Sequence, residues 1–366
     1  YNVLRTQATF TCAGGSCPVL NDWTVKWSQG INISGIAKAS DQTTNLTSGT
    51  VDVAVNGVLQ PRTGTISGGV WTIANVTAFT GNIITVFING ATSTARAVAV
   101  TKYTTSGDVT GMTLYQNHLT LGSNDNPTLT NSDLDKFDKN NAASSGHPNE
   151  VFDDVTSTSL TVCSAVPCSS ARLLVKSGTT YQPTGSVSTP NIQIDGTLIA
   201  DANTLTVAAS WKNNGVFTKG TSTVNFSATS TNETIDSTLA TTSNAFYNVT
   251  FGTGASTATW TLQSPLNASS TLSVNFGTLS NGTNVLNLGG NLSIGASGIY
   301  THGTGSTTFT GTGTSVWSDA SAGQDMGTVI VGGVTKTIQL GSAVKATNVT
   351  INSGSTLDAT ASNYGV

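Results

Sequence analysis

The sequence predicts an all-β chain in which a β-sandwich is followed by a parallel β-helix. Three observations predict this fold class. Short runs of alternating apolar and small polar residues recur through most of the chain. Glycine, with 39 copies, and many asparagines and serines separate these runs as turn residues. Only 9% of the residues are charged, against roughly 25% in an average soluble domain, and threonine and serine occupy the polar positions instead.

The first segment, residues 1–26, is predicted to contain an extended strand. Its residues 1–10, "YNVLRTQATF", carry apolar side chains at Val3, Leu4 and Phe10. A strand of this kind can add to the exposed sheet edge of a neighbouring molecule. We therefore interpret it as a candidate polymerisation strand.

The four cysteines form two short pairs, Cys12 with Cys17 and Cys163 with Cys168, and each pair encloses four residues. Four cysteines allow three pairings, of which two local disulfides are the simplest. The alternative, a zinc site, normally has a C-x2-C spacing. Disulfides favour an oxidising, extracellular location.

Residues 27–102 are predicted to form the sandwich. In "TVDVAVNGV", Val51 and Val53 share one face of a strand, and Asn56-Gly57 follows as a hairpin turn. A resemblance to a known family is carried by residues 33–35, 50–57, 69–73 and 81–90. In these residues the segment resembles the carboxypeptidase-regulatory-like or transthyretin-like sandwiches of secreted bacterial proteins. That resemblance implies an Ig-like or transthyretin-like sandwich that acts as a spacer.

Residues 103–170 are predicted to be a polar connector that holds a strand or two, the second cysteine pair and a helical turn near Leu134 to Phe137. Asp133, Asp135 and Asp138 lie here at a spacing that offers oxygen ligands to Ca²⁺. The glycine and terminal glutamate of an EF-hand loop are missing. The alternative is a solvated loop, and no other cofactor is expected.

Residues 171–366 are predicted to form the β-helix. Two similar stretches of equal length, residues 205–285 and 286–366, follow one another directly, and repetition of short strands without helices indicates a solenoid. A unit of this length would hold three or four turns of roughly 20 to 27 residues. The alternation predicts that these side chains point into the lumen: Val207, Phe226, Phe251, Val274, Leu288 and Val331.

Residues 109–366 resemble the β-helical repeats of very large secreted bacterial surface proteins, including adhesin-like ones. The stretch "LTVAASWKNNGVFTKGTSTVNFSATSTNETI" with the later "FYNVTFGTG" carries this resemblance. It implies a structural or adhesive role outside the cell or at its surface.

Charge and hydropathy exclude several classes of partner. The net charge is −4 and no basic cluster occurs, which argues against nucleic acid. No apolar run approaches the length of about 18 residues that a membrane span needs. In the repeats the one close carboxylate pair is Glu233 with Asp236 and the one histidine is His302, so we expect no enzyme.

Two functions remain. The first is a structural subunit of a pilus-like extracellular filament, in which identical copies assemble head to tail by strand addition and solenoid stacking. The second is an adhesin or fibre module that binds surface glycans, which would need exposed aromatic residues on one face. Candidate aromatics are Trp211, Trp260, Tyr300 and Trp317. A glycoprotein is a further expectation, with ten Asn-x-Ser/Thr sites: Asn32, Asn45, Asn75, Asn225, Asn232, Asn248, Asn267, Asn281, Asn291 and Asn348.

Overall fold

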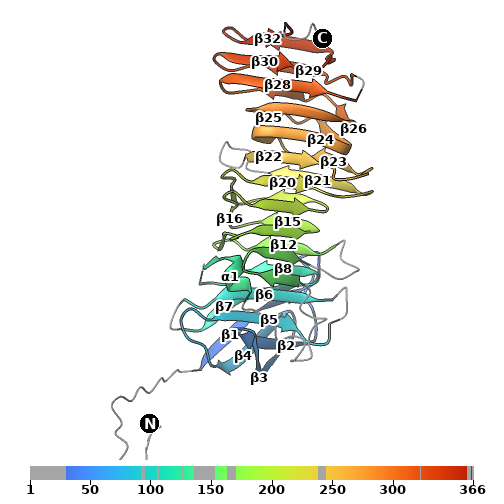
Figure 1. Cartoon of the computed structure of the whole chain (residues 1–366). Coiled ribbons are helices and arrows are strands. Elements are labelled where there is room, and N and C mark those ends of the chain that lie inside the picture. Colours follow the sequence, from blue (N-terminus) through green and yellow to red (C-terminus); the bar gives the residue numbers. More distant parts are fainter. Residues whose placement is uncertain are drawn as a thin grey trace, which may run out of the picture.

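The computed structural model is all-β and contains a β-solenoid of about 11 turns (Figure 1). It describes residues 30–91, 95–104, 107–125, 127–135, 153–162, 170–237, 245–321, 323–360 and 364. These residues hold 32 strands and one α-helix of four residues. At roughly 4.8 Å per turn, 11 turns make a rod about 50 Å long.

The N-terminal strands form two sheets that share a core. One sheet has the order β4-β1-β7, and the other joins β3, β2, β5 and β6 in antiparallel pairs. Buried residues from both sheets, among them Ile33, Trp71, Val53 and Val86, form one apolar cluster. The strands are β1 (Ile31–Lys38), β2 (Thr50–Val55), β3 (Val58–Thr65), β4 (Val70–Val76), β5 (Ile83–Ile88), β6 (Ala97–Lys102) and β7 (Val109–Tyr115).

Strand β5 connects this N-terminal unit to the solenoid. All six of its side chains are buried, because its two faces belong to different cores. Val86 packs in the N-terminal cluster, whereas Phe87 packs in the cluster that continues through the solenoid. Strand β6 pairs in parallel with β8 (His118–Leu121), and β8 pairs in parallel with β12 (Arg172–Val175). The sheet of the N-terminal unit therefore runs directly into the first turns.

The segment predicted as a polar connector contributes to the body of the molecule. It holds β7, β8, β9 (Thr128–Leu129), β10 (Asp153–Thr156) and β11 (Ser159–Val162). The helix α1 spans Asn131–Leu134 and starts before the predicted turn at Leu134. A capping box explains this start, because the Thr130 side chain accepts a hydrogen bond from the Asp133 N–H and the Asp133 carboxylate accepts one from the Thr130 N–H.

Each solenoid turn contributes strands to three parallel ladders. The first ladder contains β8, β12, β15 (Asn191–Ile194), β18 (Trp211–Asn213), β21 (Asn232–Ser237), β23 (Thr259–Leu262) and the ends of the long strands β24 (Leu266–Gly282) and β26 (Asn291–His302). The second position in the turn, called the second ladder below, is occupied by β9, β13 (Thr180–Tyr181), β16 (Thr197–Ile199), β19 (Val216–Thr218), the start of β24, β25 (Leu286–Leu288), β27 (Ser306–Phe309), β29 (Thr328–Val331) and β31 (Asn348–Ile351).

The third ladder contains β11, β14 (Ser186–Thr189), β17 (Thr204–Val207), β20 (Thr223–Phe226), β22 (Phe246–Phe251), the middle of β24, the start of β26, β28 (Gly313–Asp319), β30 (Lys336–Leu340) and β32 (Thr356–Asp358).

The turns differ in length along the third ladder. Leu205 pairs with Val224, and Val224 pairs with Val249, so the second of these two turns is the longer one. The two similar stretches of the sequence do not start at equivalent places in a turn. Leu205 lies in β17 on the third ladder, whereas Leu286 starts β25 on the second. The stretches therefore share an alternation of buried and exposed residues but occupy different positions in the turn.

Apolar side chains fill the lumen as the alternation predicts. Val207, Phe226, Phe251, Val274, Leu288 and Val331 are all buried, at 0–1% exposure. The middle turns are lined by an aromatic cluster of Trp211, Phe217, Phe226, Phe246, Phe251 and Trp260. Each turn covers the apolar faces of its neighbours, which one turn could not do alone.

The last described turn leaves its lumen-facing side chains exposed. Ile351 is 47% exposed, whereas Val331, its ladder partner one turn below, is 0% exposed. Leu357 is half-buried although Ile338 beneath it is fully buried. Figure 1 shows this turn at the end of the rod opposite β3 and β4.

Candidate functional site

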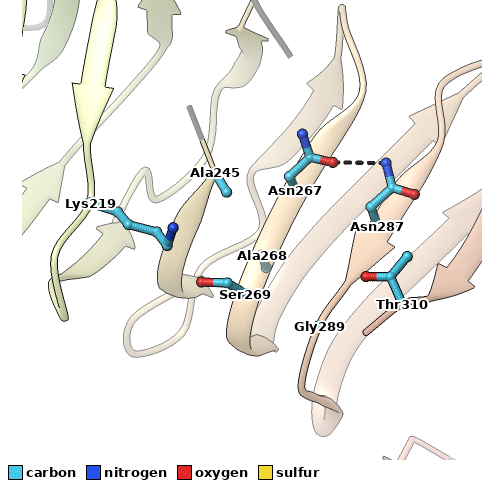
Figure 2. Close-up of a pocket in the computed structure, with 8 residues that line it drawn as sticks. All are labelled: Lys219, Ala245, Asn267, Ala268, Ser269, Asn287, Gly289 and Thr310. Carbon is cyan, nitrogen blue, oxygen red and sulfur yellow. Dashed lines mark hydrogen bonds between the residues drawn. The ribbon is translucent and has the colours of Figure 1, made fainter. Parts of the chain in front are cut away.

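A groove of about 450 Å³ opens beside the second ladder in the upper half of the solenoid (Figure 2). Residues from successive turns meet in it because equivalent positions of neighbouring turns lie one above another. Its floor is apolar, formed by Ala245 and Ala268, which are 5% and 2% exposed. The described residues that line it are Lys219, Ala245, Asn267, Ala268, Ser269, Asn287, Gly289 and Thr310.

Two asparagines are stacked along one wall of the groove. Asn267 on β24 and Asn287 on β25 are ladder partners, and the Asn287 Nδ2 donates to the Asn267 Oδ1 at 2.8 Å (Figure 2). This bond holds one amide against the other. The described residues give the Asn267 Nδ2 and the Asn287 Oδ1 no hydrogen-bond partner, so one donor group and one acceptor remain for a ligand.

Two lysines lie at the groove, one at its rim and one behind its wall. The half-buried Lys219 follows β19, and its side chain runs towards Ala245 (Figure 2). Behind the wall, Lys336 is 1% exposed, and its Nζ donates to the Gly289 carbonyl and to the Ser315 Oγ, both at 2.7 Å. Burial lowers the pKa of Lys336. Among the described residues the one ion pair within 4 Å lies elsewhere, so neither lysine has a carboxylate partner there.

A second hollow, of about 400 Å³, lies beside the first ladder. Its lining includes Ser256, Thr278, Ser297 and Ile299, which is 47% exposed, and it contains no charged side chain. The Ser256 hydroxyl already donates its hydrogen to the Ala228 carbonyl oxygen at 2.6 Å. This hollow therefore offers a ligand fewer polar and charged groups than the groove does.

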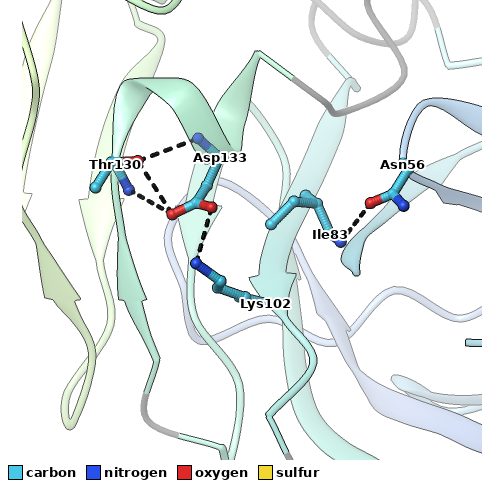
Figure 3. Close-up of polar contacts among 5 residues, drawn as sticks. All are labelled: Asn56, Ile83, Lys102, Thr130 and Asp133. Carbon is cyan, nitrogen blue, oxygen red and sulfur yellow. Dashed lines mark hydrogen bonds and ion pairs between the residues drawn. The ribbon is translucent and has the colours of Figure 1, made fainter. Parts of the chain in front are cut away.

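Of the predicted Ca²⁺ ligands, Asp133 has a structural role in α1 (Figure 3). Its carboxylate accepts from Lys102 Nζ at 2.9 Å and belongs to the capping box with Thr130. Asp135 follows as the C-cap residue, and Asp138 lies outside the described residues. Within the described ranges no group of three or more His, Cys, Asp or Glu side chains could hold a metal ion.

Several predicted residues lie outside the described part of the chain. These are the polymerisation-strand residues Val3, Leu4 and Phe10 and the cysteines Cys12, Cys17, Cys163 and Cys168. The predicted hairpin turn at Asn56-Gly57 is present between β2 and β3, and the Asn56 Oδ1 accepts from the Ile83 N–H at 2.8 Å (Figure 3).

The predicted glycosylation sites differ in accessibility. The exposed ones are Asn32, Asn45, Asn75, Asn232, Asn291 and Asn348. Half-buried ones are Asn225, Asn248 and Asn267. Asn281 is 0% exposed, and its Oδ1 accepts from the Gly303 N–H at 2.9 Å. The folded chain leaves no room for a glycan on Asn281.

The aromatic residues considered for a glycan-binding face are all internal. Trp211, Trp260 and Trp317 are 0–1% exposed, and Tyr300 is 4% exposed. Burial raises the pKa of Tyr300 to about 12, and its hydroxyl lies 3.0 Å from the Thr307 hydroxyl. These rings stabilise the lumen and are not available for stacking on a sugar.

The carboxylate pair Glu233 and Asp236 and the histidine His302 lie on different turns, at β21 and at the end of β26, and do not meet in one site. Glu233 and Asp236 lie on strand β21, and Glu233 Oε2 accepts from the Ser210 hydroxyl at 2.7 Å. His302 is exposed, and its Nδ1 lies 3.1 Å from the Gly303 carbonyl oxygen.

A buried polar cluster joins the N-terminal unit to the first turns. His118 is 1% exposed; its Nδ1 lies 2.6 Å from the Gln116 carbonyl and its Nε2 lies 3.1 Å from the Gln42 amide nitrogen. Gln42 also donates to Gln193 at 2.7 Å, as does Arg172 at 2.8 Å. Burial, with a smaller contribution from Arg172, lowers the pKa of His118 to about 4. The cluster holds a loop of the N-terminal unit against the solenoid.

Comparison with protein-family models, with curated proteins and with solved structures gives no match. No helix among the described residues is long and apolar enough to cross a membrane. Sequence reasoning missed the groove residues Lys219, Asn287 and Thr310 and the buried Lys336. The one signal for Lys336 was its place in "KTIQL", where alternation with Ile338 and Leu340 puts it on the lumen side.

Proposed function

We propose that the chain is a structural subunit of an extracellular filament or surface appendage, in which identical copies stack end to end along the solenoid axis. The observation that carries the proposal lies in the last described turn, where Ile351 is 47% exposed at a position that is fully buried one turn below. Apolar side chains and strand edges of this kind are normally covered by a further turn or a cap.

The opposite end supports the same arrangement. In the described chain β3 pairs only with β2, and Val58 on β3 is 58% exposed. Two different ends whose strand edges have no partner among the described residues could meet in a head-to-tail contact, which extends into a filament when it does not close into a ring. The two N-terminal sheets with a shared core are best interpreted as a β-sandwich that forms the base of each subunit.

The composition is consistent with a secreted rod. The lumen is mainly apolar, the surface is rich in threonine, serine and asparagine, and charged residues are only 9% of the chain. We expect a scaffolding role without catalysis.

The test is sedimentation of the purified chain and of two variants. Ile351→Lys places a charge on the open end, and Val216→Lys places the same charge on the flank, where Val216 is 43% exposed. We expect large assemblies for the unchanged chain and for Val216→Lys, and monomers for Ile351→Lys. A third variant without residues 1–10 tests strand addition. Monomers in all samples, or assembly by Ile351→Lys, would overturn end-to-end stacking.

A further inference from the structure

The groove beside the second ladder has features of a ligand site that do not depend on filament assembly. Its floor is formed by two buried alanines, and its wall and rim carry an amide donor, an amide acceptor, a threonine hydroxyl and a lysine ammonium. A small apolar floor surrounded by polar groups of mixed type fits a polar ring better than an aliphatic chain.

The charges around the groove further restrict the class of ligand that fits it. The chain has a net charge of −4, yet the described residues that line this groove include no carboxylate, and Lys219 stands at its rim. The ammonium of Lys336 lies directly behind the Gly289 carbonyl that forms part of the wall. Two ammonium groups without a carboxylate partner among the described residues favour an anion.

We infer that the groove binds one acidic sugar unit, a pyranose that carries a carboxylate. The carboxylate would lie towards Lys219, and the ring hydroxyls would bond to the free Asn267 amide nitrogen, the Asn287 amide oxygen and the Thr310 hydroxyl. The ring would lie over Ala245 and Ala268, so recognition would not need an aromatic residue.

The sugar can come from two sources. A separate saccharide could bind, or a glycan could be attached to the chain itself, because Asn267-Ala268-Ser269 is a glycosylation sequence that lines the groove. The bond from Asn287 uses the Asn267 oxygen and leaves free the amide nitrogen to which a glycan is joined. Our inference is that a separate saccharide occupies the groove.

The test titrates the purified full chain with methyl glucuronide and with methyl glucoside, which differ in the carboxylate, and follows binding by ligand-observed NMR. We expect the glucuronide to bind up to about fivefold more tightly, the effect of one partly exposed ion pair. Lys219→Gln should remove this preference. The matched control is Lys212→Gln, since Lys212 is an exposed lysine on β18 outside the groove. Thr310→Asp should abolish glucuronide binding by repulsion.

Three outcomes would overturn the inference. One is equal binding of the two glycosides, and another is the same loss of preference in Lys219→Gln and Lys212→Gln. The third is a glycan on Asn267, found by peptide mass mapping of chain from its native source, because the groove would then hold the protein's own sugar.

Discussion

Replacement of Phe226 by alanine tests whether the lumen is packed as described. Phe226 is 0% exposed and stacks on Phe251 with ring centroids 4.8 Å apart. It also contacts the rings of Trp211 and Phe246 at 6.3 and 6.1 Å. Loss of a buried phenyl ring lowers the free energy of unfolding by about 3–5 kcal/mol. Because Phe226→Ala also removes three ring contacts, we expect a loss near the upper end of that range.

The assay is equilibrium unfolding in guanidinium, followed by tryptophan fluorescence, since Trp211 and Trp260 belong to the same aromatic cluster. The matched control is Asn225→Ala, the preceding residue on the outward face of the same strand, which should change stability by no more than about 0.5 kcal/mol. A one-residue shift of register would exchange the two positions. Equal losses in both variants, or a larger loss for Asn225→Ala, would refute the packing described.

Three further predictions concern other turns. Gly298→Ala should destabilise the solenoid strongly, because the added Cβ would overlap the Val274 carbonyl oxygen of the turn below. In Gly107→Ala the added Cβ meets no atom of the described residues within 4 Å, so this variant should be nearly neutral in thermal unfolding. Burial lowers the pKa of His118 from 6.5 to about 4, so between pH 6.5 and pH 4 the histidine takes up a proton in the unfolded chain but not in the folded chain. The free energy of unfolding should therefore fall as the pH drops from 6.5 to 4. His118→Gln should flatten this part of the stability profile. Asp133→Asn should lower the free energy of unfolding by about 1 kcal/mol, because it removes the charge that forms the ion pair with Lys102. A loss of stability that is equally large in high salt would contradict this account.

The all-β class and the lumen residues could be predicted from the sequence because both depend on local alternation. Phe226 and Val207 are buried for the reason that the pattern indicates, namely that every second side chain of a strand faces the same way. The sequence did not predict at which position of a turn each of the two similar stretches begins. Leu205 and Leu286 begin similar stretches yet lie on different ladders, because the pairing of distant strands fixes where each turn closes.

The junction and the groove also depend on contacts between distant residues. The run "IITVFI" in β5 is apolar without alternation, which is typical of a strand buried on both faces and could have indicated the shared strand between two cores. No local pattern joins Lys219 to Asn287, because only the stacking of turns brings them to one groove.

Cryo-electron microscopy of the purified full chain tests the central claim, end-to-end stacking of solenoids, most directly. We predict filaments in which the solenoid axes run along the fibre and the turns give a layer spacing of about 4.8 Å parallel to it. Separate rods about 50 Å in solenoid length, with no contact between the turn that holds Ile351 and the β3 end of another copy, would contradict it.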